Sequence, residues 1–312
     1  MSSQNIKNLT GVSIMNGHFK LQNLLGSGAF GTVYCAVRTS GKGAGKEKFA
    51  VKVMPRPEEK SMKKWSLDEE LRLQATVGDH KNVVAVKEVS YEVLKGESYA
   101  CIRMDFCGLG DFLHATREGL FEDEDDVRSA FLQIIEGVQH CHQRGVFHRD
   151  LKPENVLCSK EGKNIRVRIA DFGLATDQRV CYEAHGVYGT LKYMPPERIC
   201  NLNAENRAYS PEQQDVWAIA YMLATACNGD YPWRAAFPVD PHFKAFFADP
   251  EVLGKRLPLA HVELVKVLQC ALHPDPRCRL TLQQLREQVE KIPLFKKEEK
   301  RSFFAKLFSV SD

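Results

Sequence analysis

Two short polar runs near the middle of the chain constrain its fold and chemistry more than any other feature. The first reads His-Arg-Asp-Leu-Lys-Pro-Glu-Asn over residues 148–155, and the second reads Asp-Phe-Gly over residues 171–173. Between them, apolar β-branched segments flank a turn containing Lys and Gly, which predicts a hairpin over residues 156–169. The hairpin would carry Asn155 and Asp171 at its ends. Their side-chain oxygens are hard ligands of the kind that Mg²⁺ takes beside nucleotide phosphates.

A glycine-rich turn lies near the N-terminus. Residues 26–33 read Gly-Ser-Gly-Ala-Phe-Gly-Thr-Val, and such glycines let backbone amides approach phosphate groups closely. The spacing alone is weak evidence, because dinucleotide-binding folds use it too, followed there by a helix. Here residues 32–37 are β-branched and aromatic, which predicts a strand. We therefore expect a strand–turn–strand loop.

Together these segments resemble the glycine-rich loop, catalytic loop and metal-binding turn of the eukaryotic protein kinases. Lys152, two residues after Asp150, matches the serine/threonine type. Residues 171–197 resemble the kinase activation segment, and residues 189–197 match its end, with Pro195 where Ala is usual. The resemblance implies an α+β, two-lobed protein-kinase fold with a mostly β N-lobe and a mostly helical C-lobe. It places a lead-in at residues 1–17, a kinase domain at 18–292 (N-lobe 18–104, hinge 105–108, C-lobe 109–292) and a basic-aromatic tail at 293–312.

The resemblance also implies catalytic roles. Asp150 would accept or orient the substrate hydroxyl, Lys152 would neutralise charge near the transferring phosphate, and Thr190 would bridge the two. ATP and Mg²⁺ are the implied cofactors, with Asn155 and Asp171 as metal ligands, and the nucleotide is expected between the lobes. The residues implied to contact the nucleotide are Leu25, Gly26, Ser27, Gly28, Ala29, Phe30, Gly31, Thr32, Val33, Ala50, Lys52, Met104, Asp105, Cys107, Asp111, Glu154 and Leu157. For Asp111 a helix N-cap role is equally expected and compatible.

Lys52 lies inside an apolar run, residues 49–54, where a charge costs free energy unless it has a partner. The alternative is an exposed lysine on an edge strand. The resemblance implies a glutamate partner on the next helix, expected over residues 61–76, which offers Glu69 and Glu70. At about 100° per residue, the apolar arc of that helix contains Glu70 and excludes Glu69. We therefore expect the pair Lys52–Glu70.

Further along, the resemblance implies two supporting contacts. Asp215 opens a long buried helix, residues 216–227, and would anchor the backbone of the catalytic loop. Arg279 would form an ion pair with Glu197. A buried pair of this kind is better evidence for fixed geometry than for stability.

Composition limits the partners and the compartment. The net charge of +3 is too small to argue for nucleic acid. We expect no signal peptide, no N-myristoylation (residue 2 is Ser) and no membrane span, since no run of about 18 apolar residues occurs. Ten cysteines without a Cys-x-x-Cys pair indicate a reduced intracellular protein, cytoplasmic and/or nuclear. The polar residues 1–17 are expected to be loosely ordered.

Two other classes stay open. A catalytically impaired kinase-fold scaffold would lack at least one of the catalytic groups, and none is missing. A small-molecule phosphotransferase would lack Asp215 and the Glu197–Arg279 set, which are present. Residues 70–73 and 231–233 look like fungal serine/threonine kinases that relay nutrient or meiotic signals. The expected partners are protein substrates with Ser or Thr.

The sequence also gives expectations about substrate preference, activation and the C-terminal tail. Asp111 and Glu154 occupy positions that, in basophilic relatives, face an Arg three residues before the target hydroxyl. In many relatives of the kinase family a phosphate on the activation loop pairs with the arginine that corresponds to Arg149. Residues 177–189 contain no Ser or Thr that could carry such a phosphate, so we expect the carboxylate of Glu183 to pair with Arg149 instead. The alternative is that Glu183 is exposed to solvent and has no such role. The tail, residues 293–312, is expected either to pack on its own domain or to dock a partner or membrane surface.

Overall fold

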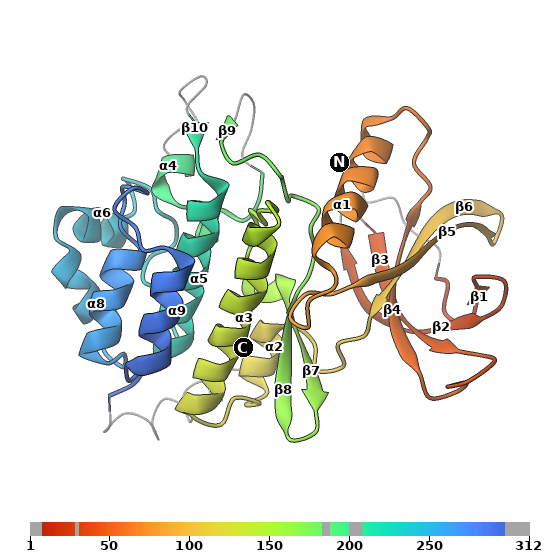
Figure 1. Ribbon diagram of the computed structural model, residues 1–312, viewed down its shortest axis with the longest axis horizontal. Helices are drawn as coiled ribbons and strands as arrows, with labels where there is room; N and C mark the ends of the chain where they lie inside the picture. The colour runs from red at the N-terminus through yellow and green to blue at the C-terminus, as the bar shows by residue number, and fades with distance from the viewer. Residues whose placement is uncertain (1–7, 29–30, 183–187, 200–207, 297–312) are drawn as a thin grey trace. The chain divides into compact units, whose positions relative to one another are not determined.

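The computed structural model describes residues 8–28, 31–182, 188–199 and 208–296. The chain divides into two compact units. The N-terminal unit comprises residues 1–79 and 84–108, and the C-terminal unit comprises residues 80–83 and 109–312. The first unit is rich in strands and the second in helices (Figure 1), so the predicted α+β fold with a β-rich part followed by a helical part is confirmed.

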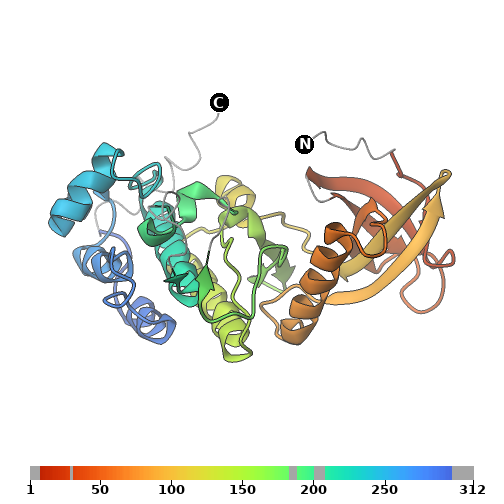
Figure 2. The same cartoon turned by 90° about the horizontal axis from the view of Figure 1, so that it is seen from above.

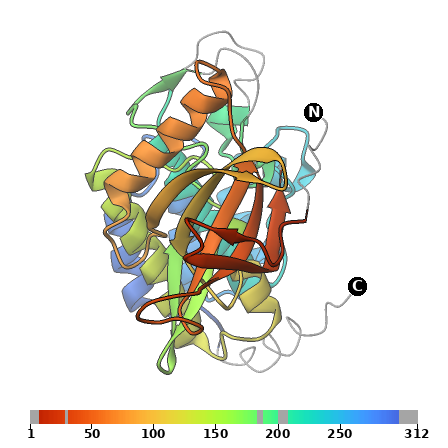
Figure 3. The same cartoon turned by 90° about the vertical axis from the view of Figure 1, so that its right-hand side faces the viewer.

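In the described residues of the N-terminal unit, six strands form one antiparallel sheet in the order β1-β2-β3-β4-β6-β5 (Figure 3). The strands are β1 (Ser13–Ile14), β2 (Phe19–Gly28), β3 (Gly31–Arg38), β4 (Lys48–Pro55), β5 (Val86–Leu94) and β6 (Glu97–Asp105). β4 is an interior strand, because it pairs with β3 on one side and β6 on the other. Its residues therefore have neighbours on both edges.

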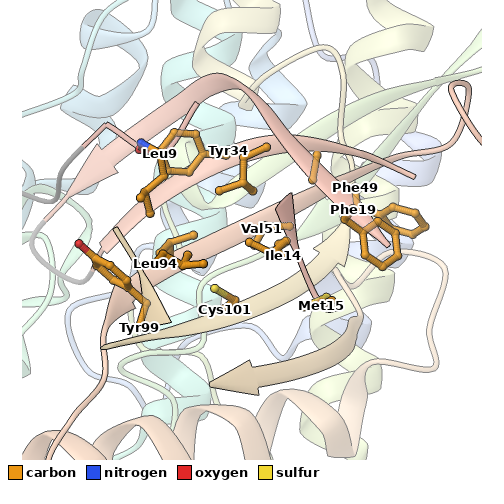
Figure 4. Close-up of a cluster of buried hydrophobic side chains, with 13 residues drawn as sticks. Leu9, Ile14, Met15, Phe19, Tyr34, Phe49, Val51, Leu94, Tyr99 and Cys101 are labelled. Atoms are coloured by element: carbon orange, nitrogen blue, oxygen red, sulfur yellow. Dashed lines mark hydrogen bonds between the residues drawn. The ribbon is translucent and has the colours of Figure 1, made fainter. Parts of the chain in front are cut away.

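A cluster of buried apolar side chains covers one part of this sheet (Figure 4). Phe19, Tyr34 and Val51 contribute from the strands, and Leu9 and Ile14 contribute from the segment before β2. Leu9 is fully buried and Ile14 is 1% exposed. The expectation of a loosely ordered lead-in is therefore wrong for residues 8–17. Burial of the few apolar residues in this polar stretch holds it on the sheet.

Helix α1 (Met62–Val77) packs through Leu67 against β6 residues Ala100 and Ile102. Its first turn is capped by Ser61, whose hydroxyl accepts a hydrogen bond from the Lys64 amide. Gln74 on the same helix is buried, and its amide donates to the Val84 carbonyl at 2.8 Å. The hydrogen bond compensates the polar group for its burial.

Strand β5 begins later than the apolar residues that start at Val83. It runs from Val86 to Leu94, while Val83 instead forms a parallel bridge to Ile169 within the C-terminal unit. β5 is at the edge of the sheet, so one of its two long edges has no neighbouring strand. Its alternating polar residues therefore weaken the apolar signal that would have marked it as a strand.

Helices dominate the C-terminal unit, and α5 packs against both α3 and α8, while α9 packs against α3 and α8 (Figure 2). The helices are α2 (Phe112–Arg117), α3 (Glu124–Gln143), η1 (Pro153–Asn155), η2 (Leu191–Tyr193), α4 (Pro196–Ile199), α5 (Pro211–Asn228), α6 (Pro241–Ala248), η4 (Pro250–Val252), α7 (Leu253–Arg256), α8 (Val262–Ala271) and α9 (Leu282–Lys291). Two small antiparallel pairs accompany them: β7 (Val156–Glu161) with β8 (Asn164–Ile169), and β9 (Cys181–Tyr182) with β10 (Ala208–Tyr209). Among the described helices, none is both long and apolar enough to cross a bilayer.

Helix α5 is the buried centre of this unit, and its ends follow from local sequence. Ser210 caps the first turn by accepting from the Gln213 amide, Pro211 occupies the first helical turn, and Gly229 ends the helix with a φ of 74°. Only glycine adopts that left-handed conformation without strain. The helix begins five residues before the predicted Val216, so Asp215 lies within its buried first turns.

The described part of the predicted tail is short. Leu294 and Phe295 are buried, and the Leu294 amide donates to Glu124 at 2.8 Å. The segment up to Lys296 therefore packs on the C-terminal unit, while residues 297–312 lie outside the described part of the chain.

Candidate active site

The glycine-rich turn joins β2 and β3, as predicted. At Gly31 the φ is +138°, and a Cβ would lie 2.7 Å from the Val53 carbonyl oxygen, so the fold itself requires glycine there. A Cβ at Gly26 or Gly28 would meet none of the described atoms within 4 Å. Packing therefore does not require glycine at those two positions, and the open backbone there would allow a phosphate to approach closely. Ala29 and Phe30 lie outside the described residues.

Lys52 projects from β4 and forms an ion pair with Glu70 of α1, with Nζ and Oε1 2.7 Å apart. Both side chains are largely buried, with 14% and 13% exposed. Glu69 instead binds Arg72 on the same helix. The choice of Glu70 from the apolar arc agrees with this geometry, and the exposed edge-strand alternative for Lys52 is excluded.

The other predicted nucleotide residues of the N-terminal unit lie on β2, β3, β4 and β6 or directly after β6. Ala50 pairs with Met104 across β4 and β6. Asp105, at the end of β6, is already engaged, because it accepts a hydrogen bond from the Ala85 amide and pairs with Lys87 at 2.9 Å. Its side chain is therefore a structural group, and any nucleotide contact there would fall to its backbone. The remaining predicted residues of this unit are Leu25, Ser27, Thr32, Val33 and Cys107, on β2, on β3 and after β6.

In the C-terminal unit three of the predicted residues converge on Asp150: Lys152, Asn155 and Thr190. Asp150 accepts from Lys152 Nζ at 2.8 Å through Oδ2 and from the Thr190 amide at 2.9 Å through Oδ1. The hydroxyl of Thr190 in turn accepts from Lys152 at 3.0 Å. Asn155 Nδ2 donates to the Asp150 backbone carbonyl at 2.9 Å and to the carboxylate oxygen Oδ2 at 3.3 Å. The carboxylate is thus held from three directions, which suits a group that must orient a hydroxyl.

The residue before Thr190 is fitted closely to this loop. Gly189 has a φ of +106°, and a Cβ there would lie 3.2 Å from Asp150 Oδ1 and 3.5 Å from the Arg149 carbonyl. Any other residue would press on the catalytic carboxylate.

Asn155 and Asp171 lie at the two ends of the β7–β8 hairpin, as predicted. The hairpin register pairs Val156 with Ile169, and the Ala170 amide donates to the Asn155 carbonyl at 2.9 Å. With its Nδ2 directed at Asp150, Asn155 accepts no hydrogen bond through Oδ1 from the described residues. Asp171 is exposed, with a φ of +62°.

The side-chain oxygens of Asn155 and Asp171 fit a magnesium ion that binds together with a nucleotide. Among the described residues, no group of three or more His, Cys, Asp or Glu side chains is placed so that it could hold a metal ion, so they contain no candidate cage of protein ligands alone. Mg²⁺ is commonly held by one or two protein oxygens together with substrate phosphates and water. Asn155 and Asp171 would hold the ion in this way, and the ion would neutralise the phosphate oxygens.

Asp215 holds the backbone on which the catalytic loop is built. Its Oδ2 accepts from the His148 amide at 2.9 Å and its Oδ1 from the Arg149 amide at 2.8 Å, and His142 also contacts it at 2.8 Å. Arg149 has a φ of +68°, an unfavourable conformation for a residue with a side chain. The Asp215 carboxylate stabilises that conformation, because two successive amides point at it.

Glu197 and Arg279 form a two-pronged ion pair at 2.9 and 3.0 Å. The Arg279 side chain is fully buried and also donates to the carbonyls of Gln213 and His273. The predicted pairing is therefore present, and it fixes the end of the activation segment to the start of α5 and the loop before α9.

Asp111 and Glu154 lie on neighbouring elements, since α2 packs against η1. Asp111 caps α2 through a 2.8 Å hydrogen bond from the His114 amide, and its backbone is bridged to Leu157. Glu154 is exposed and close enough to Tyr193 to add to the raised pKa of that phenol, which burial causes in the main. Two carboxylates on this surface would attract a cationic side chain.

One part of the site was not foreseen. Gln214, next to Asp215, is 2% exposed, and its Nε2 donates to the Arg149 carbonyl. A polar residue beside Asp215 in a helix that otherwise reads as buried was the available signal.

Comparison with known proteins agrees with this geometry. A family profile described as "Protein kinase domain" matches residues 19–289. A Schizosaccharomyces pombe protein named "Negative regulator of sexual conjugation and meiosis" is 28% identical over 292 residues, covering 87% of this chain and 59% of that protein. The "Serine/threonine-protein kinase ksp1" of the same yeast is 31% identical, covering 87% and 56%, and the rice "CBL-interacting protein kinase 5" is 29% identical, covering 91% and 57%.

The chain belongs to the protein kinase family, and its relatives are serine/threonine kinases. The prediction of serine/threonine-type kinases with fungal members among the relatives is confirmed, including one whose name refers to meiosis. The chain spans just over half the length of the curated relatives described above.

Proposed function

We propose that this protein transfers the γ-phosphoryl group of ATP to Ser or Thr hydroxyls of protein substrates, with Mg²⁺. The observation that carries the proposal is the convergence of Lys152, the Thr190 amide and Asn155 on Asp150. Phosphoryl transfer needs positioning and charge neutralisation more than covalent help. Asp150 orients the hydroxyl and accepts its proton, while Lys152 offsets charge on the phosphate.

The two units supply complementary parts. The N-terminal unit offers backbone amides beside open glycines and the charge of Lys52 steadied by Glu70. The C-terminal unit offers Asp150 and the two oxygens for the ion. Because none of these groups is replaced, an impaired scaffold is disfavoured, and the Glu197–Arg279 and Asp215 contacts disfavour a small-molecule phosphotransferase.

The direct test is an assay of the purified chain with radiolabelled ATP and three peptide pools that differ only in a central Ser, Thr or Tyr. We expect label on the Ser and Thr pools, with turnover of roughly 1–100 s⁻¹ on a good substrate. Chelation of Mg²⁺ should abolish transfer, and added Mg²⁺ should restore it. Labelling of the Tyr pool alone, or of small alcohols and not peptides, would contradict the proposal.

We also propose a preference for an Arg three residues before the target hydroxyl. Glu154 and Asp111 would bind the guanidinium through charge-assisted hydrogen bonds. We expect kcat/KM on the order of ten-fold higher for a peptide with that Arg than for the same peptide with Ala. Glu154→Gln should remove most of this ratio, whereas Glu161→Gln, at the end of the following strand β7, should leave it unchanged. A positional peptide library without basic enrichment at that place would refute the preference.

A third proposal concerns activation. Glu183, which lies outside the described residues, would supply a permanent negative charge to Arg149, so that the enzyme is active without loop phosphorylation. A carboxylate carries less charge than a phosphate, about −1 against −1.5 to −2. We expect bacterially made enzyme to keep its kcat/KM within about two-fold after phosphatase treatment, and Glu183→Ala to lower it roughly ten-fold. Glu251→Ala is the matched surface control. Activity lost on phosphatase treatment, or retained by Glu183→Ala, would refute the idea.

A further inference from the structure

Arg198, one residue after Glu197, is a buried cation that the proposed chemistry does not use. Its side chain is 1% exposed, on the short helix α4. Burial lowers its pKa to about 10, with a smaller contribution from Arg149, so it still carries its charge at neutral pH. A buried charge is costly and persists only where it is well bonded. Its contacts therefore indicate its purpose.

The first contact of Arg198 is with the activation segment. Nη2 donates to the Tyr188 carbonyl at 3.0 Å. Tyr188 is two residues before Thr190, whose amide donates to Asp150. The chain between them is Gly189, whose Cα faces Asp150 without room for a side chain. A hydrogen bond at Tyr188 therefore limits where the Thr190 amide can lie.

The second contact connects Arg198, through Gln214, to the backbone next to Asp150. Nη1 of Arg198 donates to Gln214 Oε1 at 3.1 Å, and Gln214 Nε2 donates to the Arg149 carbonyl. That carbonyl belongs to the peptide bond that joins Arg149 to Asp150. One guanidinium thus connects the activation segment with the backbone of the catalytic loop, through a single side chain, Gln214, that is 2% exposed.

An aromatic ring fixes the guanidinium in place. Its carbon lies 4.9 Å from the centroid of the Tyr209 ring, and the Arg149 guanidinium carbon lies 5.8 Å from the same centroid. Tyr209 is buried and belongs to β10, where it pairs with Cys181 of the activation segment. The ring attracts both cations through its π face, so the segment, the ring and the two arginines form one packed group.

We propose that Arg198 is a positioning residue for Asp150, holding the activation segment against the catalytic loop through Tyr188 on one side and Gln214 on the other. The inference rests on the proposed kinase function. The hydrogen bonds of Arg198 described above join it to Tyr188 and Gln214, and it acts on Asp150 through them. It restricts the orientation of Asp150, and its loss should therefore lower turnover much more than it weakens nucleotide binding.

The test compares Arg198→Met with Arg128→Met. Arg128 is a fair control because it also donates to two backbone carbonyls, those of Val289 and Ile292, far along the chain from the catalytic loop. At a temperature where both variants are folded by circular dichroism, we expect kcat to fall at least ten-fold in Arg198→Met and less than two-fold in Arg128→Met. The KM for ATP should stay within about two-fold in both. Arg198→Lys, which keeps the cation, should recover part of the loss.

Gln214→Glu gives a nearly isosteric second test if Arg198→Met folds poorly. It keeps an acceptor for Arg198 and removes the donor to the Arg149 carbonyl, so kcat should again fall. A readout independent of activity is hydrogen exchange at the Thr190 amide, expected to be at least ten-fold faster in Arg198→Met than in Arg128→Met. An active wild type with equal kcat and equal Thr190 exchange in the two variants would overturn the inference. An inactive wild type would instead overturn the proposed function, and the exchange comparison would still decide on Arg198.

Discussion

Replacing Asp150 with Asn is expected to lower the turnover of phosphate transfer on the order of 10³-fold. In the wild-type structure, Oδ2 of Asp150 accepts a hydrogen bond from the Lys152 ammonium at 2.8 Å, and Oδ1 accepts one from the Thr190 amide. Asn keeps an acceptor for Thr190 but places an NH₂ group where Oδ2 was. The substrate hydroxyl then loses the group that accepts its proton, and Lys152 loses its anionic partner.

The fold should survive this exchange, because Asn has the same shape and Asp215 still holds the neighbouring backbone. The measurement is steady-state transfer to a Ser peptide, with nucleotide affinity determined separately. Asp125→Asn, on a side chain that is 93% exposed, is the matched control and should behave as the wild type. Turnover in Asp150→Asn within a few-fold of the control would remove Asp150 from the chemistry and, with it, the basis of the proposed reaction.

The catalytic loop could be predicted because its contacts are close in sequence. Asp150, Lys152 and Asn155 lie within six consecutive residues, so one recognisable run already contains most of the polar network. The Lys52–Glu70 pair spans a longer interval, yet helical periodicity reduced the choice to one of two glutamates. For the loop the motif itself carried the information, and for Lys52 and Glu70 it was a charge in an apolar setting.

Other features were invisible because they depend on tertiary context. Leu9 and Ile14 are among a few apolar residues in a polar stretch, and only the finished sheet shows the surface that buries them. The β9–β10 pair has two residues in each strand, too few for any periodicity. Arg198 follows a recognisable motif, but its partners Tyr188 and Gln214 are 10 and 16 residues away in opposite directions along the chain. Sequence alone gives no sign that one guanidinium joins them.

Replacing Arg279 with Met is expected to destabilise the C-terminal unit by about 3–5 kcal/mol, because it breaks a buried ion pair by removing one partner. The Arg279 side chain has no exposed surface, and its loss leaves Glu197 and the carbonyls of Gln213 and His273 without their donor. It also removes the cation that lies 5.0 Å from the Trp217 ring centroid. Met has a similar length and would fill the space, so the expected effect is chiefly the unpaired charge and carbonyls rather than a cavity.

Arg277 supplies the matched control two residues away. Its side chain is 86% exposed and pairs with Asp275 at 2.6 Å, a shorter distance than those of the Arg279 pair. Ion pairs in water contribute little, since solvent and salt screen them, so Arg277→Met should leave the unfolding midpoint unchanged. Urea unfolding followed by fluorescence, with guanidinium avoided because its salt would mask charge effects, measures both variants. Arg279→Met should lower the free energy of unfolding several times more than Arg277→Met does, both at low salt and at 0.5 M NaCl. If the two variants unfold together, burial does not distinguish these pairs, and the Glu197–Arg279 contact contributes no more than a surface one.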